Sequence, residues 1–270
     1  MILALLAALF GLLIGSFLNV CIYRMPRDLS VVRPRSFCPE CNRTIAWFDN
    51  IPLLSFVLLG GRCRHCGNRI PARYPVVELL TGAAFFCAVW FLGPTLAGAK
   101  FAIFGAIMIA LVFSDLEERI LPDEFTLGGT AIGVIFAAFV PVSGGILLLI
   151  FFSSQRLWLV SVCDSLLAAA ICSGALWLLR VAYERLRHRE GLGLGDVKMG
   201  AMIGAFLGLQ GAILTLMLGS LLGALIGLSY TWFTGKDAST YELPFGTFLG
   251  VAAIGVGFFG EVIFNWYSRL

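Results

Sequence analysis

The chain has 270 residues, of which 59% are hydrophobic and only 13% are charged. Soluble domains carry about 25% charged residues, so this composition excludes an ordinary soluble enzyme and predicts a multi-span membrane protein. The net charge of +3 is small, and the placement of the basic residues is more informative than their sum.

Eight apolar runs predict the transmembrane helices: residues 1–23, 76–93, 98–114, 125–141, 160–182, 197–208, 211–233 and 245–266. Each approaches the roughly 20 residues that cross about 30 Å of hydrocarbon. The first run lacks the basic start of a cleavable signal peptide, so we expect it to remain as a span. The run at 197–208 is short and poorly separated from the next, which makes seven spans the alternative. Residues 142–152 predict an interfacial loop element.

The basic residues predict the orientation of the chain in the membrane. If the loop at residues 24–75 is cytoplasmic, sixteen of the nineteen lysines and arginines lie on the cytoplasmic side, and only Lys100, Arg156 and Arg269 do not. Cytoplasmic loops carry the excess of basic residues, so we expect the amino terminus outside. Asp115 and Asp196 then both stand at cytoplasmic ends of spans.

Glycines recur every four residues in the later spans, at positions 200, 204 and 208 and again at 219, 223 and 227. Small residues at this spacing allow two helices to approach closely in lipid. We interpret them as helix-packing positions.

The loop at 24–75 contains two Cys-x-x-Cys pairs, Cys38/Cys41 and Cys63/Cys66, separated by twenty-one residues. This spacing is typical of the four-thiolate site of zinc ribbons. Disulfides are disfavoured in the cytoplasm, so a metal is the better explanation. Four protein ligands leave no open position, so we expect a structural zinc that orders the loop. The other four cysteines lie in or beside apolar runs, and we expect them to be packing residues.

Asp115 closes one apolar run, and Asp196, in Gly193-Leu194-Gly195-Asp196, opens another. A carboxylate at the edge of hydrocarbon is costly to keep ionised and usually marks function. Two such groups brought together can share one proton, so that one deprotonates a water and the other polarises a peptide carbonyl. The alternative for Asp196 is a glycine turn followed by a helix N-cap.

Neighbouring polar residues have structural alternatives. Asp123 follows a proline and precedes an apolar run, which predicts an N-cap. Glu78 could contribute a polar contact to the site, or it could pair with Arg73 or Lys198. Lys198 could support the second carboxylate or contact the substrate backbone, although snorkelling alone also places lysines at span ends.

Seven motifs, taken in this order, resemble those of the prepilin peptidases, membrane aspartyl proteases of type IV pilus and type II secretion systems. The matching segments are Gly15–Val20, Tyr23–Pro26, Asp49–Pro52, Arg73–Glu78, Asp115–Asp123, Gly193–Lys198 and Pro244–Gly246, together with both cysteine pairs. The resemblance extends over almost the whole chain.

The resemblance implies that Asp115 and Asp196 are the catalytic aspartates, with Gly193, Gly195 and Lys198 in support. It also implies that the four loop cysteines bind zinc. Members of the family cut a short basic leader after a glycine, from prepilins or pseudopilins, at the cytoplasmic face of the bacterial inner membrane. Many then methylate the new amino-terminal residue with S-adenosylmethionine, and the cysteine loop is typical of this bifunctional type.

We therefore expect an all-α polytopic membrane protease with a small cytoplasmic zinc-ribbon-like loop. Residues 1–23 form the first transmembrane helix, 24–75 the zinc loop and methyltransferase region, and 76–270 the protease core. The expected partners are prepilins or pseudopilins and the lipid bilayer, with no nucleic acid. The only histidines, His65 and His188, lie in polar loops, which disfavours a serine or cysteine nucleophile.

Three alternatives remain open. The first alternative is a peptidase without methyltransferase activity, because the stretch between Arg27 and Cys38 is shorter than in members of the family that carry an insertion there. A proton-coupled transporter would need acids deep in several spans, where this sequence is nearly all apolar or small. A scaffold that docks through its zinc loop would explain the cysteines but leave both aspartates without a role.

Overall fold

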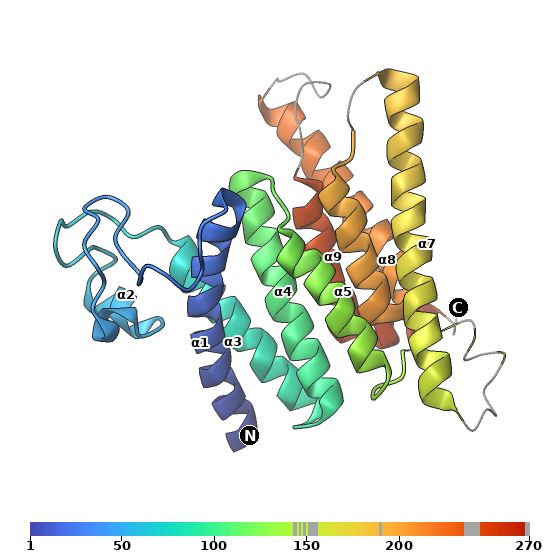
Figure 1. The fold of residues 1–270 in the computed structure, drawn as a ribbon, viewed down its shortest axis with the longest axis horizontal. Coiled ribbons are helices and arrows are strands. Elements are labelled where there is room, and N and C mark those ends of the chain that lie inside the picture. Colours follow the sequence, from blue (N-terminus) through green and yellow to red (C-terminus); the bar gives the residue numbers. More distant parts are fainter. Residues whose placement is uncertain are drawn as a thin grey trace. The chain divides into compact units, whose positions relative to one another are not determined.

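The computed structural model describes residues 1–142, 145, 147, 150, 156–188, 191–234 and 244–267, which form helices joined by loops (Figure 1). Within these residues, β pairing is limited to two isolated bridges, Phe37–Thr44 and Arg62–Arg69. The prediction of an all-helical protein is confirmed. The chain divides into two compact units, Met1–Ser114 and Asp115–Leu270, and the boundary falls inside helix α4 (Leu96–Glu118).

The first unit is built on helix α1 (Ile2–Arg24), which packs along helix α3 (Arg73–Leu92). Glycines make this contact very close. A Cβ atom at Gly15 would lie 2.7 Å from the Cα of Glu78, and one at Gly11 would lie 2.8 Å from the Thr81 carbonyl oxygen. The two helices therefore form a tight antiparallel pair, and the loop at residues 25–72 joins the end of α1 to the start of α3.

The loop contains three short helical pieces: η1 (Met25–Arg27), η2 (Trp47–Asn50) and α2 (Leu54–Leu58). It lies beside the end of α1 where that helix finishes (Figure 1). Arg24, the last residue of α1, is only 4% exposed and donates hydrogen bonds to the carbonyl oxygens of Ser30 (2.9 Å) and Arg35 (3.3 Å). The start of the loop is thereby fastened to the end of the helix.

The second unit contains helices α5 (Asp123–Ala137), α7 (Leu157–Arg187), α8 (Leu194–Thr234) and α9 (Phe245–Tyr267). Helix α8 packs against each of the other three. A Cβ atom at Gly204 would lie 2.6 Å from the Ala168 carbonyl oxygen on α7, and one at Gly219 would lie 3.1 Å from the Cα of Leu249 on α9. The interpretation as packing positions is confirmed for Gly200, Gly204, Gly219 and Gly223, each of which faces a residue of α7 or α9.

Helix α8 contains both of the predicted runs at 197–208 and 211–233. Its backbone leaves the helical conformation at Gly208, where φ is 71° and ψ is −178°. A positive φ in this region is open essentially to glycine alone. The two runs are therefore parts of one continuous element with a break close to the expected boundary.

Among the described helices, five are long and apolar enough to cross a membrane: α1, α3, α4, α7 and α8. A shorter apolar stretch, Phe245–Gly260, lies in α9. The chain is thus a multi-pass membrane protein, and the finer count of eight spans stays a prediction. The element expected at 142–152 lies largely outside the described residues, as do Arg189, Lys236 and Arg269.

The cysteines expected to be packing residues do not all behave alike. Cys21 and Cys172 are buried, as predicted, and Cys87 is half-buried. Cys163 is exposed on α7, so the prediction is wrong for that residue.

Candidate active site and metal centre

Asp115 lies in the last turn of α4 and is 6% exposed. Its Oδ2 atom accepts two hydrogen bonds from Thr247, one from the backbone N–H at 2.7 Å and one from the hydroxyl at 2.9 Å. Thr247 is in the first turn of α9, where N–H groups have no partner within the helix and the helix dipole favours negative charge. The end of α4 is thereby docked on the start of α9.

Asp196 lies in the first turn of α8 and is 8% exposed. Its Oδ2 atom accepts the backbone N–H of Gly193 at 3.1 Å, just before the helix begins at Leu194. A carboxylate that reaches back to the N–H at the helix start is half of a capping box. Asp196 is thus the third residue of α8 and not its N-cap, so the N-cap alternative is wrong, although the side chain does satisfy an N–H group at the helix start.

The two aspartates are brought near enough for their charges to interact. Leu121 supports this arrangement, because it lies between two glycines from different helices. A Cβ atom at Gly195 would lie 2.9 Å from the Leu121 Cβ, and one at Gly246 would lie 3.0 Å from the Leu121 Cδ1 and 3.2 Å from the Asp115 Cγ. Glycine at these two positions lets the starts of α8 and α9 pack closely against Leu121, just after the end of α4.

Thr247 is a site residue that the sequence reasoning missed. The motif Pro244–Gly246 was noted, but the residue directly after it was not. The sequence does contain one signal for Thr247: it is a hydroxyl residue at the start of the last apolar run. The N–H groups at a helix start bind anions, so this position could have been predicted to hold a carboxylate. The sequence does not indicate that the partner of Thr247 is Asp115, which lies 132 residues away in the chain.

The Nζ atom of Lys198 contacts the two carboxylate oxygens of Asp123, at 2.6 and 2.8 Å. The ion pair joins the start of α8 to the start of α5. Asp123 is the first residue of α5, and the N-cap position is held by Pro122, so the prediction of an Asp123 N-cap is wrong. Proline occupies a helix start easily because it has no N–H to satisfy there.

Glu78 has partners that were not foreseen. It is 8% exposed in α3, and its Oε2 atom accepts the backbone N–H of Leu53 at 2.8 Å. The Ser16 side chain of α1 also hydrogen-bonds to it. Leu53 has a positive φ of 59°, which is strained for a leucine, so the contact holds the loop in a conformation that it would not favour alone.

Four cysteines of the loop form a cluster with the donor atoms to hold a metal ion: Cys38, Cys41, Cys63 and Cys66, whose sulfur atoms all lie within 4.8 Å of one another. The Sγ atoms of Cys38 and Cys66 are 3.9 Å apart. A tetrahedral ion with zinc–sulfur bonds of about 2.3 Å separates its thiolates by roughly 3.8 Å, so the cluster fits such an ion. Backbone hydrogen bonds from Cys66 and His65 lower the pKa of the Cys63 thiol to about 7.

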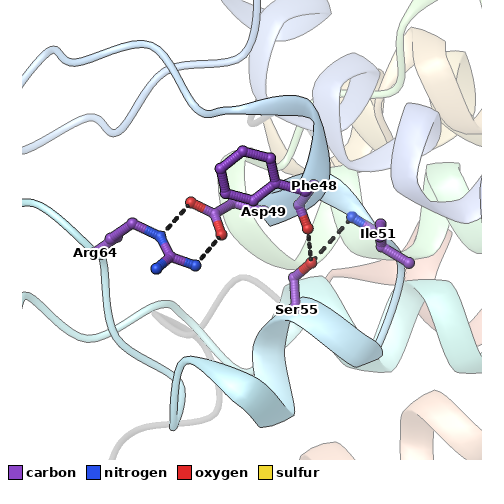
Figure 2. A network of polar contacts seen from close by, with 5 residues as sticks. All are labelled: Phe48, Asp49, Ile51, Ser55 and Arg64. Carbon is purple, nitrogen blue, oxygen red and sulfur yellow. Dashed lines mark hydrogen bonds and ion pairs between the residues drawn. The ribbon is translucent and has the colours of Figure 1, made fainter.

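The second cysteine pair is linked to η2 through Arg64. Its guanidinium binds both carboxylate oxygens of Asp49, with Nε–Oδ2 and Nη2–Oδ1 distances of 2.8 and 2.6 Å, and it lies 5.5 Å from the Phe48 ring centroid (Figure 2). The Arg64 hydrogen bonds hold the pKa of Asp49 below its usual value. Ser55 completes the network by accepting the Ile51 N–H and donating to the Phe48 carbonyl oxygen.

Two family models and several named proteins match the chain. Residues 9–92 match the family model described as the bacterial peptidase A24 N-terminal domain, and residues 102–228 match that of the type IV leader peptidase family. A protein of Legionella pneumophila named prepilin leader peptidase/N-methyltransferase is 35% identical over 97% of this chain and 93% of its own length. One of the same name from Aeromonas hydrophila is 35% identical over 97% of this chain and 92% of its own.

The chain belongs to the type IV leader peptidase family. A Myxococcus xanthus relative with the same name is 37% identical over 86% of this chain. No solved structure matches the chain. Within the family match, the N-terminal domain covers α1, the cysteine loop and α3, and the second match covers Asp115 and Asp196.

Proposed function

We propose that this type IV leader peptidase cleaves the basic leader of prepilins or pseudopilins, with Asp115 and Asp196 as its catalytic pair. The observation that carries the proposal is the approach of these two buried carboxylates, each held by N–H groups at the start of a helix. The names of the relatives support the substrate class. We further propose that the cleaved bond follows a glycine.

Two buried carboxylates at close range share one proton, and this suits hydrolysis of a peptide bond by water. The ionised member takes a proton from the water as its oxygen attacks the scissile carbonyl carbon. The protonated member donates a hydrogen bond to the carbonyl oxygen, and the amide nitrogen receives a proton as the carbon–nitrogen bond breaks. No covalent acyl intermediate forms, because the attacking oxygen is that of water.

The substrate approaches with its apolar stretch in the bilayer and its basic leader at the cytoplasmic face. Four acidic residues lie along the chain just after Asp115, and their charge attracts that leader: Glu117, Glu118, Asp123 and Glu124. Lys198 offsets the charge of Asp123. Glu117 and Glu124 are exposed and therefore carry most of this attraction.

We assign the protein to the bacterial inner membrane, with the amino terminus outside and the active site at the cytoplasmic face. The positive-inside distribution supports this orientation. Eight spans follow if α5, α9 and the two parts of α8 on either side of Gly208 each cross the hydrocarbon. Residues 76–270 then form the protease core.

The four cysteines bind one structural zinc ion. Their sulfur spacing supports four-thiolate coordination, which leaves the ion no position for a substrate or water. The ion orders a loop whose described regular structure is limited to three short helical pieces and two isolated β-bridges. A segment with so little core of its own gains its folding free energy from the metal.

A second activity, methylation of the new amino terminus, is supported by the word N-methyltransferase in the relatives' names. S-adenosylmethionine, when bound, would supply the methyl group from its sulfonium, and the neutral amine of the new terminus would accept it and give up a proton to water. The cofactor is charged and water-soluble, so its site belongs with the loop at 24–75, which we assign as the methyltransferase region.

The test is incubation of the purified protein with a prepilin and labelled S-adenosylmethionine, scored separately for leader loss and for methyl incorporation. Leader loss by the wild type and none by Asp115→Asn is the expected result. Given an already cleaved pilin peptide, Asp115→Asn should still incorporate methyl groups. Leader loss by the wild type without methyl incorporation would leave a peptidase only, and no leader loss would reject the main proposal.

A further inference from the structure

A cavity of about 400 Å³ lies between α1 and the cysteine loop. Helix α1 lines it with five residues from Leu13 to Arg24, and the loop lines it with residues of the stretches 31–36 and 45–50. Among the described residues of this lining, the charged ones are Arg24 and Arg35, and none is acidic. The volume falls in the range of about 300–1,000 Å³ that is usual for ligand sites. The charge of the lining favours an anionic ligand.

Arg24 is a nearly buried cation without a carboxylate partner. It is 4% exposed, and its two hydrogen bonds go to the neutral carbonyl oxygens of Ser30 and Arg35. The Phe37 ring centroid lies 5.8 Å from its guanidinium carbon. Among the described residues, no carboxylate lies within ion-pair distance of the guanidinium. A buried charge is costly unless an opposite charge accompanies it, so an anion in the cavity would stabilise this arrangement.

Arg35 brings a second guanidinium to the same cavity from the loop. Two adjacent guanidinium groups, each with a planar fork of N–H donors, suit the oxygens of a phosphate. The carboxylate nearest to the lining is that of Glu78, which hydrogen-bonds to Ser16. Ser16 precedes Arg24 by eight residues, or about 12 Å along α1, so Glu78 belongs to the opposite end of the cavity.

The α1 side of the cavity continues an apolar surface of that helix. Leu13 and Phe17 line the cavity and are also exposed, and Val20 follows them on the same face at a spacing of three to four residues. From Leu13 to Arg24 the helix rises roughly 16 Å, which is about half of the 30 Å hydrocarbon layer. This length matches an acyl chain of one leaflet that ends beside Arg24.

The loop side of the cavity has an apolar rim. Val32 and Trp47 both line the cavity, yet they are 79% and 73% exposed. Tryptophan is enriched at the membrane–water interface, where its ring lies among the lipid headgroups. A small anion dissolved in water would leave this rim and the apolar side of α1 uncovered. A ligand with an anionic head and an apolar tail would cover both.

We propose that the cavity binds one anionic phospholipid, with its phosphate on Arg24 and Arg35 and an acyl chain along Leu13, Phe17 and Val20. The site goes beyond peptide cleavage and methyl transfer and depends on neither. Only the choice of leaflet rests on the proposed orientation, which places the end of α1 at the cytoplasmic face, where anionic lipids attract basic segments. The bound lipid holds the start of the cysteine loop at the membrane surface.

The experiment titrates the purified full-length protein in detergent with phosphatidylglycerol and measures bound lipid by native mass spectrometry. Phosphatidylcholine with the same acyl chains is the second probe, because its choline cation offsets the phosphate. Glycerol 3-phosphate, which has the anionic head without a tail, is added as a competitor. Circular dichroism and limited proteolysis establish that each variant is folded like the wild type.

Two variants act on the cavity, and one is a matched control. Arg35→Gln removes one of its cations, and Val20→Trp fills it from α1. Arg33→Gln removes the same charge two residues before Arg35, at an exposed position that does not line the cavity. An effect of net charge alone would therefore appear equally in both glutamine variants.

We expect the wild type and Arg33→Gln to bind one phosphatidylglycerol at least about tenfold more tightly than phosphatidylcholine. Arg35→Gln should weaken phosphatidylglycerol binding about tenfold, as loss of a hydrogen-bonded charge does, and Val20→Trp should weaken binding of both lipids. Equal phosphatidylglycerol binding by folded Arg35→Gln and Arg33→Gln would overturn the proposal, as would a wild type that does not distinguish the two lipids. Displacement of the lipid by millimolar glycerol 3-phosphate would instead make this a site for a soluble phosphate compound. Because neither prepilin nor methyl donor is present, failure here leaves the proposed function untouched.

Discussion

Thr247 donates both its backbone N–H and its hydroxyl to one oxygen of Asp115, so a single residue at the start of α9 holds a carboxylate at the end of α4. The two residues are far apart in the sequence. Their contact fixes the orientation of the Asp115 carboxylate. The Asp196 carboxylate is held separately, by the backbone N–H of Gly193.

Removing either carboxylate should abolish cleavage without unfolding the protein. Asp115→Asn and Asp196→Asn each keep the shape of the side chain but remove half of the acid–base pair, so the cleavage rate should fall at least about 1,000-fold. Leader loss from a prepilin is the measurement, with membrane abundance and zinc content as controls. Near-normal cleavage by either variant would show that the pair is not catalytic.

The Thr247 hydroxyl should contribute to catalysis through Asp115. Thr247→Val removes the hydroxyl but keeps the N–H bond, and a hydrogen bond to a charged group is worth about 1.5–3 kcal/mol, or about 10- to 100-fold in rate. Thr247→Ser restores the donor and should recover most of the activity. Equal activity of the valine and serine variants would remove Thr247 from the site.

Close approach at Gly246 should be essential, whereas Gly255 in the same helix should tolerate a methyl group. A Cβ atom at Gly246 would press on Leu121 and on Asp115, but at Gly255 it meets nothing within 4 Å. Gly246→Ala should therefore lower cleavage at least tenfold. Gly255→Ala should leave cleavage unchanged and raise helix stability by up to about 1 kcal/mol. Similar behaviour of the two variants would contradict the packing described here.

The Lys198–Asp123 ion pair should be structural and weak. Its side chains are 33% and 55% exposed, and pairs of this kind contribute about 0.2–1 kcal/mol. We expect Lys198→Met and Asp123→Asn to have small effects on unfolding that do not add in the double variant. A large loss of cleavage in Lys198→Met alone would instead give this lysine a direct role with the substrate.

Replacing a cluster cysteine should release the metal and expose the loop to proteases. Cys38→Ser and Cys66→Ser each remove one of the four sulfur ligands of the proposed zinc site, and a loop folded by a metal loses its order when the metal leaves. Elemental analysis and limited proteolysis measure the two effects. Cys163→Ser, at an exposed cysteine outside the cluster, should keep both the metal and the protease resistance.

The parts of the site that the sequence could predict are those encoded locally or by the membrane. The spacing of two Cys-x-x-Cys pairs predicts the four-cysteine cluster, and the basic loops predict that Asp115 and Asp196 stand on one side of the bilayer. The contacts of Thr247 and Glu78 could not be foreseen. These contacts depend on which helix ends meet and on how the loop folds back, and neither can be predicted from the spacing of residues in the sequence.

The break at Gly208 has a consequence for the bilayer itself. The stretch of α8 before it, Leu194–Leu207, rises only roughly 21 Å, and the 15 residues of α5 beside it rise about 22 Å, whereas the hydrocarbon layer is about 30 Å thick. A short apolar helix is accommodated by thinning of the surrounding lipid. The membrane next to Asp196 should therefore be locally thin, so water reaches the carboxylates at a depth where a thicker bilayer would exclude it.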